Sequence, residues 1–173
     1  MFLACSRFIF LFTFLASVLV MGAAFYLEYG SGLEPCSLCW VQRFFLLAFA
    51  AVNLMAYLHS PKRRGVLCYA LVSLLFVVGG AASAVRQVSL QRLPPEQLMF
   101  CQPDLACMWH TLSIGEWVAT LYRGNESCAL VSWTVFGLSV AELSLLAFTG
   151  LGVLSVVQIV RSILGDKPAA PAT

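Results

Sequence analysis

Charged side chains are scarce in this 173-residue chain: only 10% of its residues are Asp, Glu, Lys or Arg, and 61% are hydrophobic. Ordinary soluble domains contain about 25% charged residues, so this composition excludes a soluble domain. The formal net charge is only +2, and we expect no nucleic acid among the partners of the chain. The composition instead indicates a protein of the lipid bilayer.

Common cofactor and metal motifs are also missing. The chain has no Gly-x-Gly-x-x-Gly and no Gly-Lys-Ser/Thr loop, so no soluble nucleotide cofactor is predicted. A zinc site built on Cys36 and Cys39 would need a second pair of Cys or His with comparable spacing. Cys101 and Cys107 are separated by five other residues, and the two histidines are isolated. We therefore expect no metal site.

Four apolar runs predict an all-α membrane protein, a four-helix transmembrane bundle forming one integral membrane domain. The expected spans are residues 8–26, 40–58, 66–85 and 143–160. The first run can cross about 30 Å of hydrocarbon, whereas the apolar part of a cleaved signal peptide is shorter, about 7–15 residues. The third run contains Gly79-Gly80, small residues that allow close helix packing, and Cys68, which we expect to be a buried apolar filler.

The placement of charge predicts the orientation of these spans. The termini and the turn between the second and third spans carry six of the ten Lys and Arg residues, and the other loops carry seven of the eight acids. Under the positive-inside rule, residues 1–7, 59–65 and 161–173 are cytoplasmic, and loops 27–39 and 86–142 face the opposite side. In the second loop, apolar residues recur at helical spacing and predict a short interfacial helix. They are Ile114, Trp117, Val118 and Leu121.

Cys36 and Cys39 lie where the first outer loop meets the second apolar run. A thiol at the start of a helix faces unpaired backbone N–H groups and the positive end of the helix dipole, which lower its pKa. Arg43 follows Cys39 by one helical turn and would favour an anion on the sulfur or on a ligand beside it. The pair therefore predicts a redox-active dithiol at the membrane boundary.

Cysteines in the second outer loop make an electron relay possible. Cys101, Cys107 and Cys128 lie there, and cysteines grouped on one side of a membrane indicate an oxidising compartment. A disulfide in one loop can pass electrons to a disulfide in the other when a thiolate attacks it. An acceptor dissolved in the bilayer, such as a quinone, would suit a pair at the membrane boundary, where Arg43 could stabilise charge on a quinone oxygen.

Several motifs occur in one order along nearly the whole chain. They are Pro35-Cys36-x-Leu38-Cys39-(x)3-Arg43, Arg86-Gln87, Leu90-Gln91 with Leu93-Pro94, Cys101-x-Pro103, and Gly124 before Cys128-Ala129-x-x-x-Trp133-x-x-x-Gly137-Leu138. In this order the sequence resembles the DsbB family of thiol:quinone oxidoreductases. That family comprises inner-membrane proteins that reoxidise DsbA, the periplasmic dithiol oxidase.

The resemblance implies a role for each cysteine of the two loops. Cys36 and Cys39 would be the membrane-proximal redox pair, and Cys101 and Cys128 the loop pair. A reduced DsbA-like partner of thioredoxin fold would attack Cys101, Cys128 would then attack Cys36, and Cys39 would be released beside the quinone.

The resemblance also implies the cofactor site and the location. Arg43 would be the quinone-site arginine, with Arg86 and Gln87 near a second quinone-contacting segment. The quinone would be ubiquinone or menaquinone. The protein would be a multi-pass protein of a bacterial inner membrane with both termini in the cytoplasm.

Some positions depart from the family pattern, and two other functions stay open. Cys107 stands where the family often has an aromatic residue, so it could compete with Cys101 for Cys128. Val140-Ala141-Glu142-Leu143 replaces a segment that commonly carries proline and tryptophan, and Leu130 replaces a frequent acid; both bear on partner preference. The alternatives are a quinone enzyme of the vitamin K epoxide reductase kind and a non-enzymatic membrane protein whose loops are stapled by disulfides.

Overall fold

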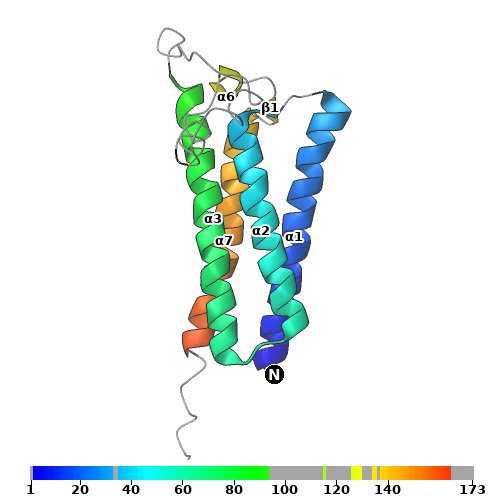
Figure 1. The fold of residues 1–173 in the computed structure, drawn as a ribbon, viewed down its shortest axis with the longest axis vertical. Coiled ribbons are helices and arrows are strands. Elements are labelled where there is room, and N and C mark those ends of the chain that lie inside the picture. Colours follow the sequence, from blue (N-terminus) through cyan, green and yellow to red (C-terminus); the bar gives the residue numbers. More distant parts are fainter. Residues whose placement is uncertain are drawn as a thin grey trace, which may run out of the picture.

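The computed structural model is a bundle of long helices that run up and down beside one another (Figure 1). It describes residues 2–32, 35–93, 115, 126–129, 134–135 and 137–164. The long helices are α1 (Phe2–Ser31), α2 (Ser37–His59), α3 (Arg63–Gln91) and α7 (Val140–Leu164). Within the described residues, these four are long and apolar enough to cross a membrane. The predicted all-α four-helix bundle is confirmed.

The four helices are longer than the four apolar runs, and each predicted span lies within one of them. A helix satisfies all its own backbone hydrogen bonds, which is why apolar runs in a bilayer adopt this form. The second outer loop is predicted to begin at residue 86. The chain stays helical as far as Gln91, so irregular structure begins only after α3. Where the bilayer begins and ends along these helices stays a prediction.

Helix α3 packs against both α2 and α7, and two adjacent glycines bring the three helices close together. A Cβ atom on Gly79 would overlap the ring of Phe45 from α2, and one on Gly80 would overlap the ring of Phe148 from α7. The predicted close packing at these small residues is confirmed. The central core also contains Met21, Leu46, Phe49, Val77 and Leu151.

Buried polar side chains also join the helices. Asn53 of α2 is 1% exposed, and its Nδ2 donates hydrogen bonds to the Phe49 carbonyl at 2.8 Å and to Ser73 Oγ of α3 at 3.2 Å. In an apolar interior such bonds replace the water that these groups would otherwise contact. Asn53 therefore fixes how α2 and α3 are rotated toward each other.

Cys68 lies on the outward face of α3, where its side chain is exposed. The prediction that it is a buried apolar filler is therefore wrong. Val66 and Ala70 are buried in this part of the helix, and the helical period turns Cys68 away from the interior. An apolar run alone cannot distinguish the inner face of a membrane helix from its outer face, because both are apolar.

At the end of the bundle that holds the α2–α3 turn, Arg63 connects α3 to α7. Its Nη2 donates a hydrogen bond to the Ile163 carbonyl at 2.8 Å, and its Nε donates to the Ser162 carbonyl. These carbonyls belong to the last turn of α7, where helix carbonyls lack partners within the helix and the dipole favours a cation. Arg63 therefore caps α7.

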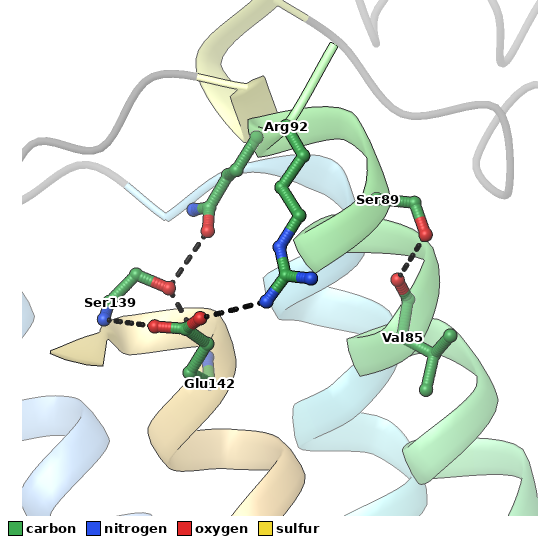
Figure 2. Close-up of polar contacts among 6 residues, drawn as sticks. Val85, Ser89, Arg92, Ser139 and Glu142 are labelled. Carbon is green, nitrogen blue, oxygen red and sulfur yellow. Dashed lines mark hydrogen bonds and ion pairs between the residues drawn. The ribbon is translucent and has the colours of Figure 1, made fainter.

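At the opposite end, the start of α7 is bound to the end of α3 (Figure 2). The Ser139 backbone N–H donates to Glu142 Oε2 at 2.9 Å, and the Glu142 N–H donates to Ser139 Oγ at 3.3 Å. This reciprocal pair is a capping box, which satisfies two N–H groups at the start of a helix. Arg92 Nη2 contacts Glu142 Oε1 at 3.3 Å, and Ser139 Oγ donates to Gln91 Oε1 at 2.8 Å. Glu142 belongs to the segment that departs from the family pattern, residues 140–143. Its contact with Arg92 therefore joins the two ends of the second loop.

Short elements of the second loop lie at this same end. They are α6 (Glu126–Ala129) and an antiparallel hairpin of β1 (Thr134–Val135) and β2 (Leu138–Ser139). Gly137 has φ of 80°, a conformation that glycine adopts without strain, and it allows the tight turn of the hairpin. The predicted interfacial helix at Ile114 to Leu121 lies outside the described residues, apart from Gly115.

We expect Ser139→Ala to lower the free energy of unfolding by about 1 kcal/mol, because the start of α7 loses its cap. Thermal unfolding in detergent, followed by circular dichroism, measures this loss. Ser89→Ala is the matched control, since the exposed Ser89 hydroxyl bonds back to the Val85 carbonyl within its own helix (Figure 2). Its change should stay within about 0.5 kcal/mol. Equal midpoints for the two variants would show that the capping box does not stabilise the bundle.

Candidate redox site

Cys36 and Cys39 meet at the first turn of α2. Cys36 is the N-cap residue with extended backbone, and the Trp40 N–H donates to its carbonyl at 3.3 Å. The turn brings the two sulfurs to 3.0 Å from each other. Cys36 is 4% exposed, and its side chain makes no hydrogen bond to the N–H groups of the helix start. The sequence motif is thus a pair of neighbouring sulfurs at a helix start, as the spacing predicts.

Cys128 of α6 is buried beside this pair. Cys36 and Cys128 belong to one buried apolar cluster with Leu38 and Leu90, and Cys128 is 0% exposed. Ser37 Oγ lies 3.7 Å from Cys128 Sγ. The structure therefore brings a sulfur of the second loop to the pair of the first loop. Cys101 and Cys107 lie outside the described residues, so the pairing of Cys128 with either stays a prediction.

The surroundings of Cys36 disfavour its thiolate. A hydrogen bond with Cys128, a hydrogen bond with Cys39, and burial all raise the pKa of Cys36 above its ordinary value. The expectation that the helix start lowers the thiol pKa is therefore wrong for Cys36. Its side chain turns into the apolar cluster and away from the N–H groups that would stabilise an anion. A thiol with a raised pKa is a poor leaving group in disulfide exchange.

Two buried glutamines connect Cys39 to α3. Gln87 Nε2 donates to Cys39 Sγ at 3.5 Å, and Gln42 Nε2 donates to Gln87 Oε1 at 2.8 Å. Gln87 was predicted at the site from the family resemblance. Gln42 was missed, although it follows Cys39 by three residues and so shares its helix face. The hydrogen bond from Gln42 orients Gln87 so that the amide nitrogen of Gln87 points toward Cys39 Sγ.

Arg43 is buried against α1. Its Nη1 pairs with Glu28 Oε2 at 2.5 Å, and its Nη2 donates to the Ala24 carbonyl at 3.3 Å. Its guanidinium carbon lies 4.9 Å from the centre of the Phe25 ring and 5.3 Å from that of Trp40. The carboxylate compensates the burial of the cation, and the rings add cation–π attraction. Glu28 could not be predicted as the partner of Arg43, because nothing in the local sequence links the two residues.

Arg86 stands beside Gln87 in the chain, on α3. Its Nε is buried and has no hydrogen-bond partner among the described residues. An unsatisfied buried donor costs free energy, so a missing acceptor is expected close to it. Among all the residues that the structure describes, no group of three or more His, Cys, Asp or Glu side chains could hold a metal ion.

The family model described as "Disulfide bond formation protein DsbB" matches residues 6–158, nearly the whole chain. The chain belongs to the DsbB family. The resemblance noted in the sequence is thereby confirmed, and a protein of this family with four apolar helices is a multi-pass bacterial membrane protein that functions in disulfide bond formation.

Curated DsbB relatives match over almost their full lengths. Disulfide bond formation protein B of Stutzerimonas stutzeri is 42% identical over 92% of this chain and 98% of its own. Disulfide bond formation protein B 1 of Pseudomonas aeruginosa is 44% identical over the same shares. Disulfide bond formation protein B 2 of Pseudomonas fluorescens is 40% identical over 98% of this chain and 97% of its own. No solved structure matches the chain.

Proposed function

We propose that this protein is a thiol:quinone oxidoreductase. It reoxidises a periplasmic DsbA-like dithiol protein of thioredoxin fold and passes the electrons to a membrane quinone, ubiquinone or menaquinone. The observation that carries this proposal is the burial of Cys128 against Cys36, whose Sγ lies 3.0 Å from Cys39 Sγ. A structural staple needs two sulfurs, whereas a relay needs a third sulfur that can attack the pair. The family and its relatives support the same reading.

The electrons move through four thiol exchanges. A thiolate of the reduced partner attacks Cys101 of a Cys101–Cys128 disulfide, and Cys128 leaves as a thiolate. Cys128 Sγ then bonds to Cys36 Sγ, the Cys36–Cys39 bond breaks, and its electron pair leaves on Cys39. The raised pKa of Cys36 supports this direction, because Cys36 is the poor leaving group and stays bonded. The second thiol of the partner then attacks its own sulfur bonded to Cys101, which frees the oxidised partner and leaves Cys101 as a thiolate. Cys101 finally attacks Cys128, so the Cys101–Cys128 disulfide forms again and Cys36 is released beside Cys39 as a dithiol.

Donor side chains of α2 and α3 suit a quinone, which has an apolar ring and carbonyl oxygens that accept hydrogen bonds, and one of them, Gln87, contacts Cys39. The buried Arg86 Nε is a donor without a partner among the described residues. Arg43 contacts Glu28 and Ala24 through Nη1 and Nη2, and a guanidinium has five donors. Arg43, Gln87 and Arg86 would hold the quinone by hydrogen bonds. When bound, a quinone supplies a two-electron, two-proton acceptor, so the electron pair of the dithiol can leave the protein.

The location that we propose is the bacterial inner membrane. Loops 27–39 and 86–142 would face the periplasm, and the termini and residues 59–65 the cytoplasm. In support, Cys36 and α6 lie at one end of the bundle, while the N-terminus and the basic α2–α3 turn lie at the other (Figure 1). Reporter fusions after Ser31, Ser60 and Leu164 test this arrangement. A cytoplasmic reporter after Ser31 would overturn it.

A reconstituted assay tests the activity itself. The purified protein is mixed with a reduced DsbA-like protein and a short-chain ubiquinone or menaquinone, and the quinone absorbance is followed. We expect quinone reduction that requires both the protein and the dithiol partner. Absence of quinone reduction, with disulfides that stay oxidised and do not exchange, would overturn the proposal and favour the stapled membrane protein.

A further inference from the structure

Ser37 is the first helical residue of α2 and lies between the two cysteines of the pair in sequence. Its side chain is buried, and its Oγ lies 3.7 Å from the Sγ of the buried Cys128. The family motif leaves this position open. The contact is between a hydroxyl and a sulfur that come from different loops of the chain.

The surroundings of this contact make the hydroxyl important. Leu38 and Leu90 line the cluster around Cys128, so a thiolate there has lost its water. Burying an anion without a hydrogen-bond donor costs free energy. A hydrogen bond to a charged acceptor is roughly twice as strong as one to a neutral acceptor. Ser37 can supply this donor, because its O–H rotates freely and points wherever an acceptor lies.

We propose that Ser37 is a catalytic residue of the exchange between the loops: its hydroxyl donates a hydrogen bond to the Cys128 thiolate and holds that sulfur beside Cys36. This inference rests on the proposed function. In the step concerned, the Cys128–Cys36 bond forms, the Cys36–Cys39 bond breaks, and the electron pair leaves on Cys39. The hydroxyl keeps its proton throughout, so the charges and atoms balance without a further reactant.

The hydrogen bond speeds the exchange because it raises the thiolate fraction of Cys128 at neutral pH. A more stable thiolate is also a weaker nucleophile, but nucleophilicity falls only about 0.4–0.5 as steeply as the pKa, so the gain in thiolate fraction is larger. Without the hydroxyl, we expect the exchange to be roughly threefold to fourfold slower at neutral pH. At high pH, where Cys128 is ionised in either protein, the difference should reverse, with the variant roughly threefold faster because its thiolate is the stronger nucleophile.

Single-turnover mapping of the full-length protein tests this. Oxidised protein in detergent is mixed with dithiothreitol, quenched with acid, and digested, and the peptide pair linked through Cys36 and Cys128 is quantified by mass spectrometry. Ser37→Ala should form it roughly threefold to fourfold more slowly at neutral pH, with the pH midpoint of the rate raised by about one unit. Ser37→Thr keeps the hydroxyl and should restore both values.

The pH profile separates chemistry from packing. An alanine variant with the wild-type rate and midpoint would overturn the inference, and so would a loss of rate that is equal at every pH. Ser37→Ala and Ser37→Thr should unfold at similar temperatures in detergent, as followed by circular dichroism, which shows that the alanine variant is folded. Dithiothreitol replaces the protein partner, so this readout does not depend on the wild-type assay for quinone reduction, whose failure would overturn the proposed function alone.

Discussion

Cys36→Ser is expected to abolish quinone reduction by the dithiol partner, with kcat lowered roughly a thousandfold or more. Cys36 is the sulfur that meets both others: it lies 3.0 Å from Cys39 Sγ and shares a buried cluster with Cys128. A serine oxygen fills nearly the same space but cannot form a disulfide, so electrons arriving at Cys128 have no route to Cys39. The reconstituted quinone assay measures the loss.

Two further variants show whether the loss of activity is specific to the relay. Cys68→Ser is the matched control, because Cys68 is exposed on the outer face of α3 and we expect kcat to be unchanged. Cys39→Ser should also stop quinone reduction but leave Cys36 bonded to Cys128, which a mass map of the non-reduced protein detects. Full activity of Cys36→Ser would contradict the relay through Cys36, although the chain would still belong to the DsbB family.

The bundle could be predicted from sequence because a bilayer allows few structures. Long apolar runs must form helices there, and charge asymmetry predicts their direction. The position of Cys36 and Cys39 at a helix start could be predicted as well, since a polar loop gives way to an apolar run at that point. Both inferences depend only on residues close together in the sequence.

Local sequence could not predict which side chains of different helices meet at the site, and Gln87 was expected there only from the family resemblance. Gln87 meets Cys39 and Gln42 across the α2–α3 contact, and Glu28 meets Arg43 across the α1–α2 contact. Which side chains meet depends on how each helix is rotated about its axis. That rotation follows from contacts such as the rings seated on Gly79 and Gly80, and these appear only when the helices are packed.

The wrong expectation for Cys36 has a similar origin. Local reasoning places a thiol at a helix start beside free N–H groups, which would lower its pKa. In the folded chain, burial and hydrogen bonds with two other sulfurs raise it instead. One of those sulfurs, Cys128, belongs to a loop far along the chain. The contact with Cys128 that makes the local prediction wrong also supplies the attacking sulfur of the proposed relay.

Arg43→Ala is expected to raise the quinone KM roughly tenfold or more, because a donor to the charge that develops on a quinone oxygen is lost. The Cys36–Cys39 disulfide should still form, since neither sulfur depends on Arg43 for its position. The variant should also unfold more easily, by about 3 kcal/mol, because the Glu28 carboxylate is left largely buried without its cation. Quinone titration of the purified variant gives KM, and thermal unfolding in detergent gives the stability.

Glu28→Gln separates these two effects of the ion pair. It removes the negative charge that holds Arg43 and so lowers stability, but its amide oxygen can still accept from Arg43, and the guanidinium keeps its charge for a quinone oxygen. We therefore expect its quinone KM to equal or fall below that of the wild type, while Arg43→Ala raises KM. If folded Arg43→Ala kept the wild-type quinone KM, Arg43 would serve only to join α1 to α2. A parallel rise of KM in both variants would lead to the same conclusion, because KM would then follow the ion pair and not the cation.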